Sequence, residues 1–419
     1  MRRSILGVGV SLIFVGAISS TACSSSSNSS TTDGTDSGAA NDSATSSDGA
    51  TNDSATGGDG GKGPLGFTPS NVDLSGIDLT TVGDFIVDND ECTIDTNDLL
   101  ASCGNGGGLL GFKVATQSDG SEVAVYVAKS MNILAGQNLT VTGARPLVFI
   151  ALGSITITGT LNANGKGDVA VAGGAAASET NFVHGNGPGG GAAGPATAGG
   201  GGGSYCGTGG IGGAESGTPA VATAAYGSPT ITPLVGGSSG GAGEGTSGTG
   251  GGAIQLVAGI SITIDATGLI QVGGGGGAFG GISGQEANGG GSGGSILLES
   301  LAVSISGTLA SNGGGGGAGT AEGVGSAPPD DPGGADSLAS ATAAAGGKKG
   351  VGPSSGGDGS AGASIVGAAG AFTAANAAGA GGGGAGRIRI NTKTGSATLS
   401  GTISPATSTV CATQGTVHP

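Results

Sequence analysis

Few residues in this sequence have the types and spacing that chemistry requires. The two histidines, His184 and His418, have no neighbouring pattern for acid–base or metal work, and we interpret both as solvated loop residues. The pair Asp330–Asp331 stands in a proline-rich turn, and Arg387 and Arg389 alternate with isoleucines, so we expect both arginines to face outward from a strand. Glycan cleavage needs carboxylates gathered on one face. The sequence therefore predicts no enzymatic activity, no metal site and no cofactor.

Glycine-rich strings match the letters of two enzyme motifs without their context. Gly236–Gly240 has the spacing of a hydrolase nucleophile elbow, which needs a strand-to-helix turn and a positioned histidine. Gly-x-Gly-x-x-Gly strings also occur, but no strand–helix–strand unit surrounds them, as dinucleotide binding requires. In a chain this rich in glycine, such matches are expected by chance.

Four cysteines follow Cys23, and an even number in an exported chain indicates disulfides with three possible pairings. We favour Cys92–Cys103, which encloses a short loop, and this leaves Cys206 with Cys411. A zinc site is the alternative, but no closely spaced cysteine or histidine pair supports it. The acidic stretch 84–98 lacks the spacing of a calcium loop, so a solvated acidic face is expected there.

The N-terminus carries the features of an export signal. Met1-Arg2-Arg3 is basic, residues 5–18 are largely apolar but too few to span a bilayer, and small residues precede Cys23. This arrangement resembles the signal of bacterial lipoproteins, although Ser20 stands where a leucine is common. The resemblance implies that residues 1–22 are removed and that Cys23 carries the lipid. An ordinary signal peptide cut nearby is the alternative.

Residues 23–63 contain serine, threonine, asparagine, aspartate, alanine and glycine with no large apolar side chain, which predicts a disordered tether. The chain has a formal net charge of −16, and its few basic residues are scattered. We therefore expect no nucleic-acid partner. We expect a cell-envelope protein, held by its lipid in the outer membrane or at the cell surface of a bacterium.

The composition excludes ordinary helical enzymes, because 101 of 419 residues are glycine and glycine costs about 1 kcal/mol per helix position. The folded part starts near Pro64 with an acidic N-terminal cap region, residues 64–120. From residue 121 onward, short stretches alternate apolar and small polar side chains, the period of a half-buried strand. Five of them end at a small residue, and these are 139–143, 155–159, 262–266, 303–307 and 397–401.

Such units cannot bury their apolar face alone, but stacked units can. Stacking would place Ile157, Ile264, Ile305 and Leu399 in one interior ladder. The stretch 155–165 resembles coils of filamentous-haemagglutinin-type adhesins, which implies a parallel β-helix. The sequence thus predicts an all-β fold, a short parallel β-helix (solenoid) over 121–419, with a β-sandwich of the same strands as the alternative.

Three glycine-rich segments, 162–250, 273–293 and 310–386, are predicted to be insertions at one repeated corner of the solenoid. They are expected either to be disordered or to pack locally as polyproline-II-like glycine helices. In composition they resemble the glycine-rich regions of PGRS surface proteins, without the helical domain that accompanies those. The function that follows is a structural or adhesive role towards an extracellular glycan or matrix. The alternative is a glycan-binding or glycan-cleaving β-helix.

Overall fold

A computed structural model describes residues 64–89, 92–103, 111–166, 169–280, 285–320, 333–348, 354–372 and 377–418. The chain divides into two compact units, Met1–Gly57 and Gly58–Pro419, and every described residue belongs to the second. The predicted signal peptide, Cys23 and the tether to residue 63 lie outside the described residues, as do Asp330 and Asp331. The described residues form strands, turns and extended segments, without a helix.

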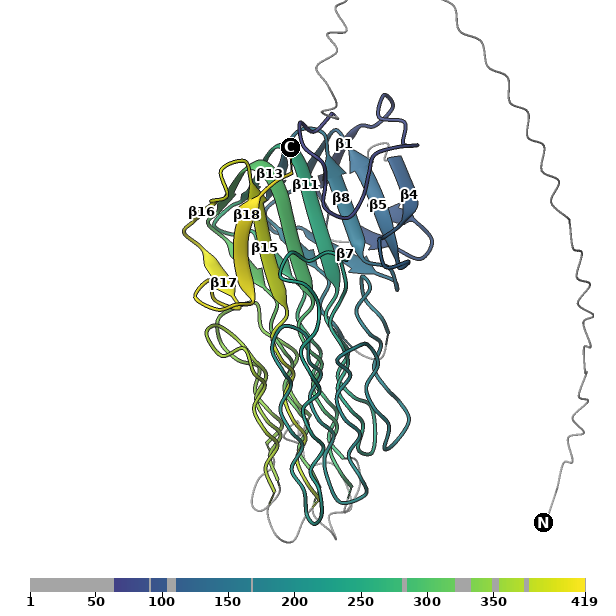
Figure 1. Cartoon of the computed structure of the whole chain (residues 1–419), viewed down its shortest axis with the longest axis vertical. Coiled ribbons are helices and arrows are strands. Elements are labelled where there is room, and N and C mark those ends of the chain that lie inside the picture. The colour runs from purple at the N-terminus through teal and green to yellow at the C-terminus, as the bar shows by residue number, and fades with distance from the viewer. Residues whose placement is uncertain are drawn as a thin grey trace, which may run out of the picture. The chain divides into compact units, whose positions relative to one another are not determined.

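One sheet has eleven strands, most of them parallel, with the antiparallel pair β4–β5 at one edge and β18 at another. Figure 1 shows it in the upper part of this unit. Its strands are β1 (Asp84–Val87), β4 (Gly111–Thr116), β5 (Glu122–Ala128), β6 (Ser130–Ile133), β8 (Leu147–Ala151), β9 (Ile155–Ile157), β11 (Ala253–Ile264), β13 (Ser295–Ile305), β15 (Arg387–Thr392), β16 (Thr398–Leu399) and β18 (Ala412–Thr416).

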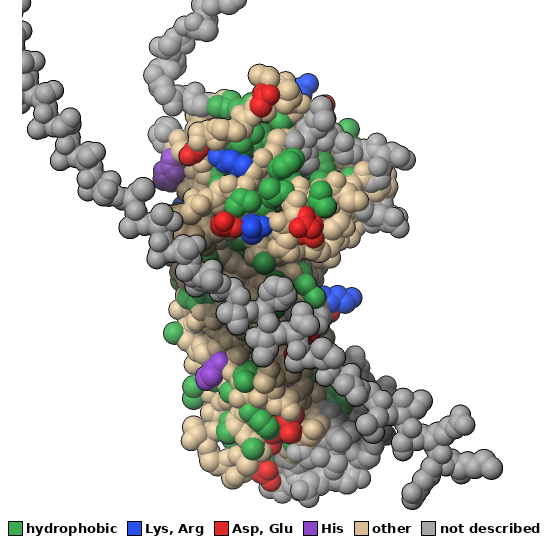
Figure 2. Space-filling view, turned by 90° about the vertical axis from the view of Figure 1, so that its right-hand side faces the viewer, with side chains coloured by type: hydrophobic (Ala, Val, Ile, Leu, Met, Phe, Trp, Pro, Cys, Tyr) green, Lys and Arg blue, Asp and Glu red, His purple; other side chains and the backbone are tan. Residues whose placement is uncertain are grey.

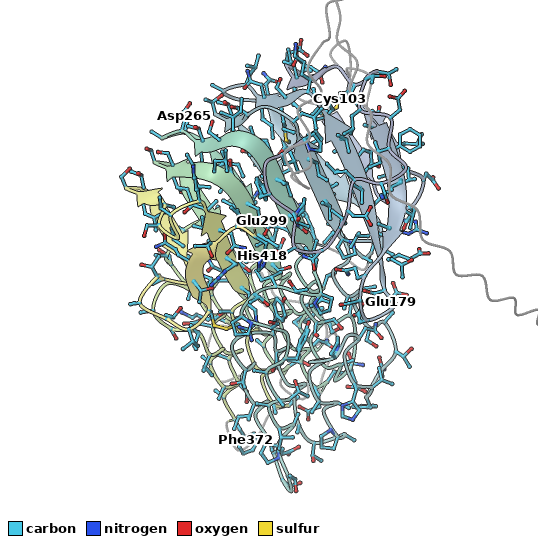
Figure 3. All side chains as sticks on the ribbon, turned by 45° about the horizontal axis from the view of Figure 1, so that its top comes forward. Cys103, Glu179, Asp265, Glu299, Phe372 and His418 are labelled. Atoms are coloured by element: carbon cyan, nitrogen blue, oxygen red, sulfur yellow. A yellow bond between two sulfur atoms is a disulfide. The ribbon has the colours of Figure 1, made fainter. Side chains whose placement is uncertain are left out.

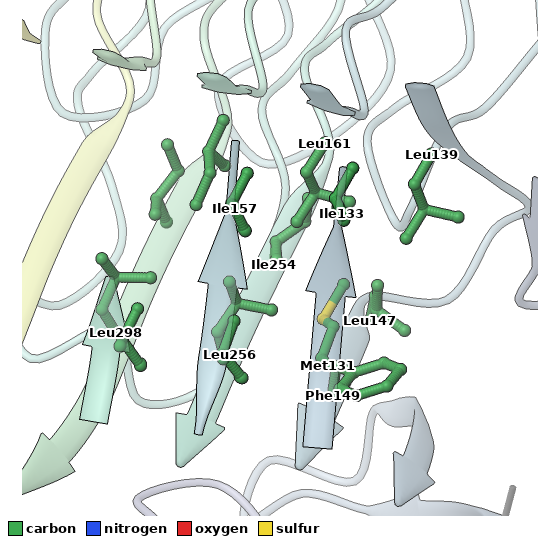
Figure 4. Packing of buried hydrophobic residues seen from close by; sticks show 14 of the residues in the cluster. Met131, Ile133, Leu139, Leu147, Phe149, Ile157, Leu161, Ile254, Leu256 and Leu298 are labelled. Carbon is green, nitrogen blue, oxygen red and sulfur yellow. The ribbon is translucent and has the colours of Figure 1, made fainter. Parts of the chain in front are cut away.

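The second sheet has seven short strands in the order β17-β14-β12-β10-β7-β2-β3, parallel except for the last pair. Its strands are β2 (Cys92–Asp95), β3 (Leu100–Ser102), β7 (Asn138–Thr142), β10 (Thr160–Asn162), β12 (Leu269–Gln271), β14 (Thr308–Ala310) and β17 (Thr402–Ser404). Apolar side chains of both sheets meet in one buried cluster (Figure 4). The two sheets therefore enclose a shared core.

The predicted ladder is present in the parallel register. Ile157 pairs with Ile264, which pairs with Ile305, which pairs with Leu399. The three isoleucines are fully buried, and Leu399 packs against them at the edge. Stacked apolar side chains at each position fill the space between the sheets, so the alternation in the sequence sets the register.

The prediction of a short parallel β-helix is wrong. The strands form two separate sheets that face each other, and both include an antiparallel pair. Among the described residues, no third sheet closes a coil. Stacked alternating strands satisfy two facing sheets as well as a solenoid, so the pattern alone did not separate them. Where a coil would continue, the chain runs instead into glycine-rich segments that lack the side chains to form another sheet face.

The glycine-rich segments form a bundle of extended chains that lie side by side below the sheets in Figure 1. Hydrogen bonds of segment 286–294 show the local geometry. Gly289 N–H donates to Gly241, and three residues later Ser292 N–H donates to Ser238. The intervening amides donate to two other segments at the same interval of three, and these bonds are Gly290 to Gly381, Gly293 to Gly384, Gly291 to Gly275 and Gly294 to Val272.

The carbonyl oxygens of this segment follow the same interval with three further neighbours. They accept from Gly200 and Gly203 in one segment, from Gly314 and Gly317 in a second, and from Gly248 and Gly251 in a third. Polyproline II has three residues per turn and no internal hydrogen bonds, so successive backbone groups point outward in three directions. Segment 286–294 is therefore an extended helix with three residues per turn, and six neighbouring chain segments hydrogen-bond to it.

Close backbone packing explains why these positions are glycine. A Cβ added to Gly291 would meet the Thr249 carbonyl group, and one added to Gly383 would meet the Gly291 carbonyl group. The obstacles are backbone atoms of neighbouring segments, which cannot rotate away as a side chain can. Collagen uses glycine for the same reason where its chains approach most closely.

The three predicted insertions leave the second sheet after the neighbouring parallel strands β10, β12 and β14 and return into β11, β13 and β15 of the large sheet. The segments pack against one another as a body of their own, and the locally packed glycine-helix alternative is the one the hydrogen bonds support. The backbone hydrogen bonds explain why the described parts of these segments pack together. Each segment satisfies its polar groups through partners far away in the sequence, so no segment depends on the sheets alone.

The substitution Gly291→Ala is expected to lower the free energy of unfolding by about 3 kcal/mol, because its Cβ would displace a neighbouring backbone. The matched control is Gly275→Ala, whose added Cβ would lie 3.0 Å from its nearest atom, the Gly165 carbonyl oxygen. We expect the control to change stability by less than about 1 kcal/mol. Chemical denaturation of both variants measures the difference, and equal stabilities would contradict the packing described above.

Candidate functional site

Both cysteine pairs are bonded in the structure. Cys92 and Cys103 join β2 to the residue after β3, and Cys206 and Cys411 join a glycine-rich segment to the residue before β18. The second disulfide spans 205 residues and fastens the bundle to the last strand of the large sheet. The cysteines therefore act as structural links between the parts of the fold.

The other polar residues considered in the sequence are not brought together. His184 and His418 are both exposed, and His418 contacts Thr68 through its backbone. In the acidic stretch, Asp84 accepts a hydrogen bond from Ser130 at 2.7 Å, and Asp95 accepts one from the Asn97 amide at 2.8 Å. Within the described residues, no three histidine, cysteine, aspartate or glutamate side chains are placed to hold a metal ion.

The two arginines of β15 do not simply face solvent, as the sequence suggested. The Arg387 guanidinium lies over the Tyr205 ring, 5.6 Å from its centroid, and donates to the Tyr226 carbonyl oxygen at 2.9 Å. Burial lowers the pKa of Arg387, and the two tyrosines oppose that shift. Arg389 donates to Asn391 Oδ1 at 2.8 Å. Arg387 therefore stabilises the junction between sheet and bundle, where its cation–π contact with Tyr205 adds attraction.

The sequence did not predict the buried carboxylate on β13. Glu299 is fully buried on the large sheet, where Figure 3 labels it. Gln255 and Asn391 donate to its oxygens at 2.7 and 3.0 Å, and Ser70 donates through both its amide and its hydroxyl. The hydrogen-bond donors are neutral, and the charge of Arg389 interacts electrostatically with the same carboxylate. Glu299 thus binds the segment around Ser70 to the sheet through hydrogen bonds. The only signal in the sequence was one glutamate in an apolar run.

A pocket of about 550 Å³ opens where the sheet meets the bundle. Pro146, Pro188 and Leu234 supply apolar walls, and Glu122 and Arg145 supply charged groups. The Arg145 guanidinium is held at 2.8 Å from a Glu122 carboxylate oxygen. Its Nη1 donates to the Thr96 and Asn97 carbonyl oxygens at 3.2 and 3.0 Å, so its orientation is fixed.

The pocket has the size and lining of a small-molecule site, and its described lining residues show no nucleophile with an adjacent base. Its size is within the range of small-molecule sites, which combine apolar walls with a few placed polar groups. Ser121 lines it, but the Ser121 hydroxyl donates to Asp119 at 2.6 Å and has no histidine beside it. A nucleophile needs an adjacent base. The described lining therefore suits recognition of a polar ligand, with Glu122 as acceptor and Arg145 as donor.

Comparisons of the chain with protein families, with curated proteins and with solved structures found no match. The described residues contain no helix long and apolar enough to cross a membrane.

A second buried carboxylate lies in the bundle. Glu286 is 2% exposed, and its Oε2 accepts from the Ala378 amide at 2.5 Å. Burial raises the pKa of Glu286 to about 7, the hydrogen bond from Ala378 opposes this shift, and the carboxylates of Glu215 and Glu244 add to it. Compared with the unfolded chain, the folded state therefore favours the protonated form of the Glu286 carboxyl group.

This shift predicts that the bundle is more stable in acid. Below about pH 4.5 Glu286 is protonated in both states; between pH 4.5 and 7 the unfolded state ionises first, and stability falls. The loss should reach about 3 kcal/mol above pH 7, at 1.36 kcal/mol per pKa unit. The substitution Glu286→Gln should flatten this dependence. Chemical denaturation from pH 4 to pH 8 measures it, and an unchanged slope in the variant would contradict the assignment.

Proposed function

We propose that this chain is a lipid-anchored surface protein with a structural or adhesive role, and that the glycine bundle is the part it presents. The observation that carries the proposal is the hydrogen-bonded bundle itself, with six neighbours around segment 286–294. A body that satisfies its backbone groups internally holds a fixed outer surface. The proposal assigns no reaction to the chain.

The outer segments of the bundle supply a surface for contact. Two backbone hydrogen bonds join segment 365–372 to segment 207–214: the Gly367 amide donates to the Thr208 carbonyl oxygen, and the Gly370 amide donates to the Ile211 carbonyl oxygen. The Gly212 amide in turn donates to the Ala220 carbonyl oxygen. These adjacent segments expose Val366, Ile211 and Val221 by 50%, 42% and 56%. Exposed apolar groups in neighbouring segments are typical of interaction surfaces. We infer that this surface contacts extracellular matrix or glycan.

The proposed anchor is Cys23, followed by the tether to residue 63, which places the folded unit at a distance from the membrane. The two disulfides are compatible with an oxidising compartment outside the cytoplasm. The proposed location is the cell envelope, in the outer membrane or at the surface of a bacterium. The lipid then supplies the membrane contact, and the bundle supplies the others.

Bacteria that lack the gene, complemented with variants of the full chain, test this role. Cys23→Ser should move the protein from the membrane fraction to the soluble fraction and abolish attachment of the cells to matrix-coated surfaces. The triple change Ile211→Ser, Val221→Ser and Val366→Ser should keep the anchor and reduce attachment at least fivefold. The matched control is Leu301→Ser with Val410→Ser, at exposed apolar positions elsewhere. Full attachment by the triple variant would contradict the adhesive role.

The pocket between sheet and bundle favours a second candidate, a glycan-binding protein. A fixed carboxylate and a fixed guanidinium, 2.8 Å apart, can accept from and donate to neighbouring sugar hydroxyls. The proline and leucine walls would cover the apolar face of a sugar ring. The glycan-cleaving form of this idea has less support, because Asp330 lies outside the described residues and Arg389 is bonded to Asn391.

Glycan-array binding by the purified full chain tests this second candidate. Glu122→Gln removes the acceptor charge but keeps the shape of the side chain, so it should weaken any glycan signal about tenfold. Lys113→Gln is the control, because Lys113 pairs with Asp73 outside this pocket. A signal that both variants retain would place binding elsewhere, and no signal at all would reject this candidate.

A further inference from the structure

The strand β4 is an open edge of the large sheet. It pairs with β5 and with no other strand in the described part of the chain. An edge strand presents unpaired N–H and C=O groups, which can pair with a strand from another chain. The outermost position of β4 therefore leaves one side of its backbone available.

The pairing of β5 shows which groups of β4 are free. The Ala124 amide donates to the Pro146 carbonyl oxygen at 2.9 Å, on the side of β8, so the backbone groups of Val123, Val125 and Val127 face β4. Their partners on β4 are Ala115, Lys113 and Gly111. The remaining residues, Phe112, Val114 and Thr116, direct their N–H and C=O groups away from the sheet, and none of the described residues hydrogen-bonds to these groups.

The same residues expose apolar side chains. Phe112 is 57% exposed and Val114 is 37% exposed. They pair with Tyr126 and Ala124, so their side chains lie on the core-facing side of the sheet, beyond the edge of the core. Figure 2 views this side of the molecule, where hydrophobic side chains gather in the upper part beside charged ones. An open backbone edge and two apolar side chains thus coincide on one strand.

We propose that β4 is the self-association edge of this protein and pairs with β4 of a second copy about a two-fold axis. An antiparallel pair of identical strands satisfies both edges at once, as an isologous interface requires. Addition of a strand to an open edge is an established mode of recognition, in which the backbone supplies affinity and side chains supply selectivity. This proposal is independent of the adhesive role.

Charge and hydrogen bonding select one register. With Val114 opposite Val114 of the second copy, all three outward-facing residues form hydrogen-bonded pairs, and Phe112 faces Thr116. Lys113 then faces Ala115. A register centred on Lys113 would place two lysines directly opposite each other, which is destabilising, and would pair fewer outward-facing residues. The Val114-centred register is therefore the one the strand favours.

A cysteine at position 114 tests this register in the full chain. Cα atoms of a hydrogen-bonded antiparallel pair are about 5.5 Å apart, within the range of a disulfide. Val114→Cys should therefore form a reducible dimer under mild oxidation. Thr116→Cys is the matched control, because its two copies would be four residues, about 13 Å, apart along the strands. Non-reducing gels and light scattering measure dimer formation.

We expect at least tenfold more crosslinked dimer from Val114→Cys than from Thr116→Cys. In a separate experiment without added cysteines, Val114→Lys should shift the full chain from dimer to monomer in light scattering, because a charge would be buried in the pair. Val410→Lys, at a position 72% exposed elsewhere, should leave the mass unchanged. Equal crosslinking of both cysteine variants, or a monomeric parent chain, would overturn the proposal.

Discussion

The backbone hydrogen bond between neighbouring glycine segments is the interaction on which the rest of this structure depends. An extended helix with three residues per turn has no internal hydrogen bonds, so each buried N–H and C=O group must find a partner in another segment. The bonds of segment 286–294 return to the same neighbour at every third residue, which allows six neighbours around one chain. At the closest approaches, such as Gly291 and Gly383, glycine is required, since an added Cβ there would meet backbone atoms.

The sheets and the bundle support each other through specific contacts. Ile157, Ile264 and Ile305 form a ladder that sets the parallel register of the large sheet. The chain enters the bundle after β10, β12 and β14 of the second sheet and returns into β11, β13 and β15 of the large sheet, so the parallel registers of both sheets fix where each bundle segment starts and ends. Arg387 over Tyr205 and the disulfide between Cys206 and Cys411 then hold the two parts together. The pocket lined by Glu122 and Arg145 lies between sheet and bundle, so its shape depends on both.

The sequence predicted local strands better than it predicted their assembly. Alternation identified 155–159 and 262–266 as equivalent, but it also grouped 139–143 with them, whereas β7 pairs with β10 in the other sheet. Both sheets bury every second side chain, so the pattern does not say which sheet a strand joins. The bundle could be foreseen only as an alternative, because glycine has no side chain to indicate a partner. Glu299 was missed because Ser70 is 229 residues away.

Amide hydrogen exchange of the native full chain tests the bundle most directly. If every amide from residue 289 to residue 294 donates to a neighbouring segment, all of them should exchange slowly, with no alternation along the segment. Residues 379–386 should behave in the same way, because their amides also return to the same neighbours at every third residue. Exchange of these glycine amides at the rates of an unfolded chain would contradict the account.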